Sequence, residues 1–142
     1  MQRITILLAD HNTLVRREVR RILDLEDDLQ VVGQTKDGRE AVALVKKLCP
    51  AIVLMEIGLP RLNGLEATRQ ILEAVPATKV ILLAAHTDEA YVEAAINTGA
   101  MGYLLKQTCG ATVCPAIREV QKGKTCFSPS IPRRLHQRNR KQ

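Results

Sequence analysis

The chain has 142 residues, of which 46% are hydrophobic and 25% are charged, and its formal net charge is +6 at pH 7. These proportions exclude an intrinsically disordered chain, and the length allows one domain with a short extension. No stretch approaches the roughly 20 apolar residues of a membrane span, and the N-terminus lacks the features of a secretion signal. We therefore expect a cytoplasmic protein that does not engage a membrane.

The positive charge is concentrated near the C-terminal end. Five positive charges without any acid among them come from Arg133, Arg134, Arg138, Arg140 and Lys141, which leaves +1 for the rest of the chain. The preceding segment 128–132 has the Ser- and Pro-rich composition of a linker. The basic run can touch phosphates, but it has no aromatic residue for base stacking, which favours a solvated linker. We predict one domain over residues 1–124 and a basic linker over 125–142 that leads to an absent domain.

Short apolar runs recur at a regular spacing and predict five strands. The runs cover residues 4–9, 31–33, 51–55, 80–85 and 103–105. They are rich in Val, Ile and Leu and do not alternate with polar residues, as is typical of parallel strands that are covered on both faces. The weakest run, 31–33, is expected at an edge.

Five stretches with helical periodicity follow these runs. The first is amphipathic, and its expected inward residues are Leu14, Val15, Val19, Ile22 and Leu23. The second and third end before Pro50 and Pro76. The fourth, 88–98, is expected to bury Tyr91, Ala94 and Ala95, and it ends at Gly99. The fifth covers about 112–122 and ends at Gly123.

The alternation of strands and helices predicts an α/β fold, with a doubly wound five-stranded parallel sheet flanked by five helices. Ligands of such sheets bind beyond the carboxyl ends of the strands, where the strand order reverses. The residues at those ends are Asp10, His11, Glu56, Ala84 and Lys106. If the strand order is 2-1-3-4-5, as we expect for this fold, these residues converge on one crevice.

Several motifs resemble the receiver domains of NarL/FixJ (LuxR-type) two-component response regulators, which have a flavodoxin-like fold. The motifs are Leu-Leu-Ala-Asp-His-Asn-Thr-Leu-Val-Arg (7–16), Val-Val-Gly (31–33), Asp-Gly-Arg-Glu-Ala (37–41), Val-Leu-Met (53–55), Asn-Gly-Leu-Glu-Ala-Thr (63–68) and Gly-Ala-Met-Gly-Tyr-Leu-Leu-Lys (99–106). They keep the order and spacing of the family, and the resemblance covers about residues 3–130.

The resemblance implies a phosphoacceptor pocket, and this chain departs from it at three positions. The family's phosphorylated Asp corresponds to Glu56, and the second of two acids that hold Mg²⁺ corresponds to His11. The hydroxyl residue that binds the phosphoryl oxygen corresponds to Ala84. Only Asp10 and Lys106 match the family pattern.

Physical reasoning on these departures predicts a degenerate pocket. Mg²⁺ requires oxygen ligands in near-octahedral geometry, whereas the imidazole of His11 suits transition metals. The Glu56 carboxylate lies one methylene further out, and a misplacement of about 1 Å can cost on the order of a hundredfold in rate. Ala84 offers no hydroxyl. We expect no phosphorylation at Glu56, no metal or cofactor, and a sharply reduced affinity for Mg²⁺.

The charges of the pocket predict an internal ion pair. Asp10, Glu56 and Lys106 with a neutral His11 sum to −1, compared with −2 for three acids and one Lys. We expect Lys106 to pair with Glu56 or with Asp10 in a partly buried salt bridge. His11 is either a neutral filler or a pH-responsive contact. Tyr103 corresponds to the family's switch aromatic, and it either has a fixed orientation or fills a groove beside the fourth helix.

The pattern favours a regulatory domain over an enzyme. No Gly-rich phosphate loop follows the first strand, which disfavours a nucleotide-binding enzyme. By resemblance, the chain is the receiver of a transcription regulator, with a second copy, a histidine kinase or another regulatory protein as partners. DNA would be bound only by an absent helix-turn-helix domain. The alternatives are a stand-alone interaction module without a DNA-binding domain and an orthodox phosphoacceptor that uses Glu56.

Overall fold

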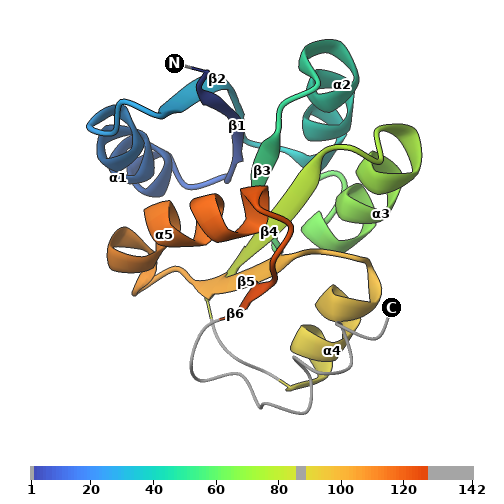
Figure 1. Cartoon of the computed structure of the whole chain (residues 1–142). Helices are drawn as coiled ribbons and strands as arrows, with labels where there is room; N and C mark the ends of the chain where they lie inside the picture. Colours follow the sequence, from blue (N-terminus) through green and yellow to red (C-terminus); the bar gives the residue numbers. More distant parts are fainter. Residues whose placement is uncertain (1, 86–88, 128–142) are drawn as a thin grey trace.

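A parallel β-sheet forms the middle layer of the protein, as seen in a computed structural model that describes residues 2–85 and 89–127 (Figure 1). The strands are β1 (Ile4–Ala9), β2 (Leu29–Thr35), β3 (Ile52–Glu56), β4 (Lys79–Ala84), β5 (Gly102–Leu105) and β6 (Cys126–Phe127). Their order is β2-β1-β3-β4-β5-β6, which confirms the predicted order of the first five strands. The sixth strand pairs in parallel with β5 and lies in a segment that the sequence had assigned to the linker. The rest of that segment, 128–142, is outside the described residues.

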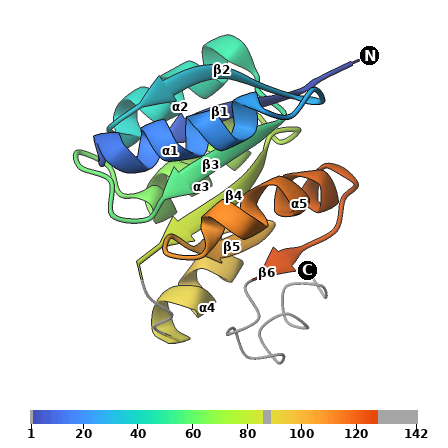
Figure 2. The same ribbon diagram turned by 90° about the vertical axis from the view of Figure 1, so that its left-hand side faces the viewer.

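Helices cover both faces of the sheet. They are α1 (Thr13–Asp24), α2 (Gly38–Leu48), α3 (Gly64–Ala74), α4 (Glu89–Asn97) and α5 (Cys109–Gln121). Figure 2 shows α1 and α5 on one face and the other three helices on the opposite face. None of the helices in the described part of the chain has the length and apolar character needed to cross a membrane.

Side-chain caps begin the first three helices at the carboxyl edge of the sheet. Asn12 accepts hydrogen bonds from the backbone N–H groups of residues 14 and 15, and Asp37 and Asn63 each accept one from the N–H three residues further on. Such caps satisfy N–H groups that have no partner within the helix. Helices α2 and α3 end before Pro50 and Pro76, as predicted. These three helices therefore begin just after the carboxyl ends of β1, β2 and β3.

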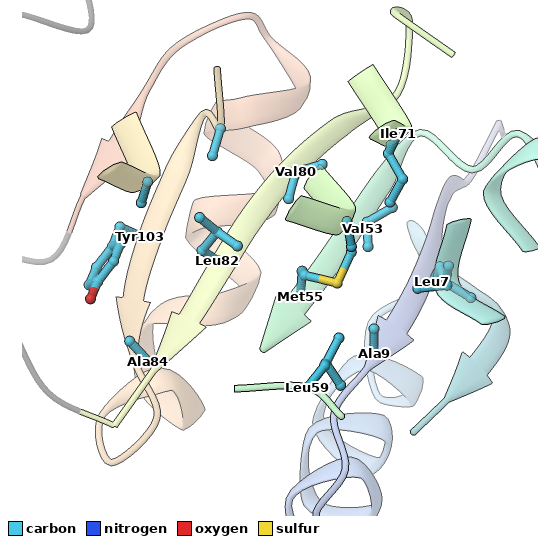
Figure 3. Close-up of a cluster of buried hydrophobic side chains, with 14 of the residues drawn as sticks. Leu7, Ala9, Val53, Met55, Leu59, Ile71, Val80, Leu82, Ala84 and Tyr103 are labelled. Carbon is cyan, nitrogen blue, oxygen red and sulfur yellow. The ribbon is translucent and has the colours of Figure 1, made fainter. Parts of the chain in front are cut away.

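The core consists of two apolar layers because successive strand residues point to opposite faces. Leu7, Val53 and Leu82 face α2, α3 and α4, whereas their neighbours in sequence face α1 and α5. Figure 3 shows the first of these layers, in which Ala84 and Tyr103 share the same face. All of these strands are buried on both sides, as the continuous apolar runs predict.

Two residues that were expected to point inward do not. Leu14 is 72% exposed because it lies on the same stripe of α1 as Glu18 and Arg21, while Val19 and Leu23 face the sheet. Tyr91 is 50% exposed at the edge of the buried stripe of α4, which is instead formed by Val92, Ala95 and Ile96. Both expectations were wrong.

Helix α5 begins three residues earlier than predicted, at Cys109, which is buried. Pro115 stands inside the helix, where it lacks the N–H that would complete the helical hydrogen-bond pattern. The apolar contacts of Val113, Ala116 and Ile117, all fully buried, hold this helix against the sheet despite the missing bond.

Gly64, the first residue of α3, is predicted to be essential for stability. A Cβ atom there would overlap the backbone oxygen of Glu56 and lie 2.8 Å from the Cα of Ile57. The Gly64→Ala variant should therefore lose about 1–3 kcal/mol of unfolding free energy, as overpacked cores do. Urea unfolding measures this loss.

Gly110→Ala is the matched control. Its added Cβ would meet only the Cδ1 atom of Ile22, at an ordinary 3.6 Å. We expect its unfolding free energy to change by less than about 1 kcal/mol. Equal midpoints for the two variants would contradict the close approach of α3 to the end of β3.

Candidate functional site: an ion-paired pocket at the carboxyl edge of the sheet

The structure brings the predicted site residues together at one edge of the sheet. Asp10 and His11 follow β1, Glu56 ends β3, Ala84 ends β4 and Lys106 follows β5. These strands are neighbours and run in the same direction, so their carboxyl ends meet. The convergence expected from the sequence is therefore present.

Lys106 pairs with both carboxylates that the sequence had left as alternatives. Its Nζ lies 2.6 Å from Oε2 of Glu56 and 2.9 Å from Oδ2 of Asp10. It also donates a hydrogen bond to Oδ1 of Asp10 at 3.2 Å. The three side chains are 18%, 8% and 4% exposed for Lys106, Glu56 and Asp10, respectively, so these ion pairs are largely shielded from water.

His11 contacts the other carboxylate oxygen of Glu56 through two polar groups. Its backbone N–H donates to Oε1 at 3.0 Å, and its Nδ1 lies 2.6 Å from the same oxygen. Since an ionised carboxylate only accepts hydrogen bonds, we assign the hydrogen of the ring to Nδ1. The imidazole itself is 55% exposed. Both oxygens of Glu56 are therefore engaged within the protein.

Opposing effects set the ionisation of the three buried groups. Burial raises the pKa of Asp10 above its usual value, against hydrogen bonds from the N–H of Asn12 and from Lys106. Burial also opposes ionisation of Glu56, but the hydrogen bonds from Lys106 and His11 outweigh it and lower the pKa of that carboxyl. For Lys106, the two carboxylates outweigh burial and raise the pKa. Glu56 and Lys106 are thus held as a charged pair.

Two supporting contacts at this edge carried no signal in the helical periodicity. The N–H of Asn12 donates to Oδ1 of Asp10 at 2.9 Å, and the Arg16 guanidinium donates to the carbonyl of Asp10 at 2.7 Å. Arg16 is not among the residues that the amphipathic pattern predicted to point inward. These two hydrogen bonds depend on the path of the loop between β1 and α1, which the helical periodicity does not describe.

A cavity of about 170 Å³ opens beside the ion pairs. Glu56 and Lys106 line one part of it, and Ala84, Tyr91 and Tyr103 line much of the rest. Tyr103 is fully buried, so its ring points into the protein. The sequence did not place Tyr91 here, because it was expected within the core.

Asp10, His11 and Glu56 are the described residues with the spacing of possible metal ligands. One ligand atom from each lies within 4.8 Å of the other two. The set offers two carboxylates and one imidazole, and Lys106 already binds both carboxylates. A cation would therefore have to compete with an ammonium group that is tethered in place.

Comparison with known proteins assigns the family. Residues 6–118 match the model of the response regulator receiver domain. The chain belongs to this family. It is 39% identical over 133 residues to the transcriptional regulatory protein DegU of Brevibacillus brevis, and 30% identical over 138 residues to the response regulator protein VraR of Staphylococcus aureus.

These relatives are longer than this receiver. The alignments cover 94% of the chain and 56% of DegU, and 97% of the chain and 66% of VraR. The chain therefore spans about half to two thirds of the length of the curated relatives it matches. The remaining parts of DegU and VraR have no counterpart in the aligned residues of this chain.

Solved structures agree with the family at the level of the fold. A LuxR-family two-component response regulator from Aurantimonas sp. SI85-9A1 superposes with a TM-score of 0.88 at 30% identity, covering 99% of this chain and all of that one. The receiver domain of the putative response regulator NarL from Mycobacterium tuberculosis gives 0.84 at 29% identity, covering 87% and 100%. The receiver fold and its NarL/LuxR-type relationship are thereby established.

Lys106→Met should destabilise the receiver by about 3 kcal/mol, because removing one partner leaves two buried carboxylates without compensation. Lys122→Met is the control, since Lys122 forms an exposed pair with Glu119 at 3.2 Å, and such pairs contribute at most about 1 kcal/mol. Thermal unfolding at neutral pH compares the two. Equal melting temperatures for the two variants would contradict the claim that the ion pairs of Lys106 stabilise the receiver.

Glu56→Gln should be most destabilising at neutral pH. Because the folded-state pKa of Glu56 is lowered, its contribution is present above the unfolded pKa, about 4.3, and is lost as the pH falls through the folded value. The difference in unfolding free energy between the unmodified receiver and the variant should therefore shrink between pH 6 and pH 3. Urea unfolding across this range measures the difference. A difference that grows toward acid pH would contradict a lowered pKa for Glu56.

Proposed function

We propose that this receiver regulates transcription as part of a longer response regulator and that it does so without aspartyl phosphorylation. The observation that carries the proposal is the occupation of the pocket by the chain's own charges. Lys106 holds Asp10 and Glu56, and His11 takes the remaining oxygen of Glu56. This arrangement favours one fixed conformation over a phosphorylation switch.

The donor set argues against the Mg²⁺ that receivers use. Mg²⁺ needs near-octahedral oxygen ligands, and His11 supplies nitrogen at a position where the family has an acid. Oδ2 of Asp10 is buried without a hydrogen bond from the described residues, but it lies 2.9 Å from the Lys106 ammonium. This oxygen therefore already faces a cation. We infer that Mg²⁺ binds weakly and that no cofactor is needed.

The phosphoryl group would also find few partners here. Glu56 corresponds to the phosphoacceptor, and its ionised carboxylate is stabilised by Lys106 and His11 rather than left free for attack. Ala84 has no hydroxyl to bind a phosphoryl oxygen. The burial of Tyr103, the proposed switch aromatic, is consistent with a conformation that is held without phosphorylation.

The names of the relatives support a proposal for the role of the whole protein. DegU is named a transcriptional regulatory protein, and the chain covers about half of it. We propose a receiver over residues 1–124 and a linker over 125–142, which starts with the short β6 strand and leads to a DNA-binding domain. DNA would then be contacted only by that domain. We expect a regulatory, non-enzymatic receiver that works in the cytoplasm, with a homodimer and a histidine kinase or another protein as its interactions.

Incubation with acetyl phosphate and Mg²⁺ tests this proposal. The receiver should gain no phosphoryl mass in intact-protein mass spectrometry, because Glu56 is engaged and the hydroxyl is missing. The triple variant Glu56→Asp, His11→Asp, Ala84→Thr restores the family's residue types and should become labelled under the same conditions. A phosphoryl adduct on the unmodified receiver would overturn the proposal.

A further inference from the structure

The cavity beside the ion pairs has the dimensions of a small-molecule site. Its volume of about 170 Å³ is similar to that of engineered apolar cavities of roughly 150 Å³ that bind benzene. It lies at the carboxyl edge of the sheet, where ligands of doubly wound folds bind. The small side chain of Ala84 leaves this space open at the end of β4.

The walls of the cavity suit an apolar body. Tyr91 from α4 contributes an aromatic ring, and Ile57 and Ala85 add aliphatic surface. Tyr103 is fully buried, whereas Tyr91 is half exposed and lies where the cavity meets solvent. A ring-sized apolar group would gain contacts with these side chains as it leaves water.

The charged end of the cavity favours a cation. Lys106 is matched by two carboxylates, Asp10 and Glu56, so their ionised forms leave one negative charge uncompensated. Oε2 of Glu56 accepts a hydrogen bond from Lys106 and, as a carboxylate oxygen, can accept a second. Gly58 carries no side chain and lines the cavity next to this oxygen.

We propose that this cavity binds a small primary amine, whose ammonium group donates to Glu56 and whose apolar body packs against Tyr91 and Ile57. A carboxylate or phosphate ligand would instead meet the uncompensated negative charge. The inference rests on the proposed function in one respect: it assigns a small-molecule input to a pocket that, under that proposal, is not phosphorylated.

Tyrosine fluorescence provides a local readout. The chain has two tyrosines and no tryptophan, and both tyrosines line the cavity. Three probes with the same ring, cyclohexylmethylamine, cyclohexylmethanol and cyclohexanecarboxylate, do not absorb in the tyrosine band and differ only in the polar group. We expect the amine to change the emission with an affinity at least about tenfold higher than that of the alcohol, corresponding to about 1.4 kcal/mol. The carboxylate should have no effect.

Variants separate the charge from the shape of the site. Glu56→Gln should reduce the affinity for the amine to that of the alcohol, while Ala84→Leu should abolish the binding of both by filling the cavity. Ala43→Leu, on the exposed face of α2, is the size-matched control and should bind like the unmodified receiver. Tyr91→Ala changes a half-exposed residue, so it should fold even if Ala84→Leu does not, and it should weaken the amine and the alcohol alike.

Two outcomes would overturn the inference. If none of the three probes alters the emission, the cavity does not take a ligand of this class. If the alcohol or the carboxylate binds as well as the amine, the charge assignment is wrong. Neither outcome depends on the acetyl phosphate experiment, so failure of this inference and failure of phosphorylation independence can be told apart.

Discussion

The ion pairs of Lys106 with Asp10 and Glu56 are the constraint on which the site depends. They join the ends of β1, β3 and β5, and the two acidic side chains are almost completely buried. Without a positive charge at this point, two carboxylates would face one another in a poorly solvated space, which is costly. Lys106 supplies this positive charge as a permanent part of the chain.

The unusual residues at the pocket are physically consistent with one another. The longer side chain of Glu56 reaches both Lys106 and His11, and the imidazole of His11 donates a hydrogen bond where an acidic side chain could only accept one. Ala84 contributes no polar group and leaves room beside the ion pairs. Together these residues form an ion-paired cluster with one uncompensated negative charge next to a cavity, and both proposals rest on that arrangement.

Much of the fold could be predicted from the sequence because its signals are local. Continuous apolar runs indicated buried parallel strands, and Asn12, Asp37 and Asn63 are residue types that begin helices. The errors occurred where local pattern is ambiguous. Leu14 is apolar but lies on the solvent stripe of α1, and the two-residue strand β6 is too short for any periodicity to reveal.

The sequence by itself determined which residues stand at the strand ends, and therefore that Asp10, His11, Glu56, Ala84 and Lys106 share one edge. Only the tertiary structure decided how they are connected: Lys106 binds both acids, His11 takes the second oxygen of Glu56, and Tyr91 joins Tyr103 around a cavity. The reason is that the strand ends follow from local apolar runs, and the carboxyl ends of neighbouring parallel strands meet at one edge. Contacts between side chains that are 45 to 96 residues apart depend on loop paths and rotamers that only the folded chain defines.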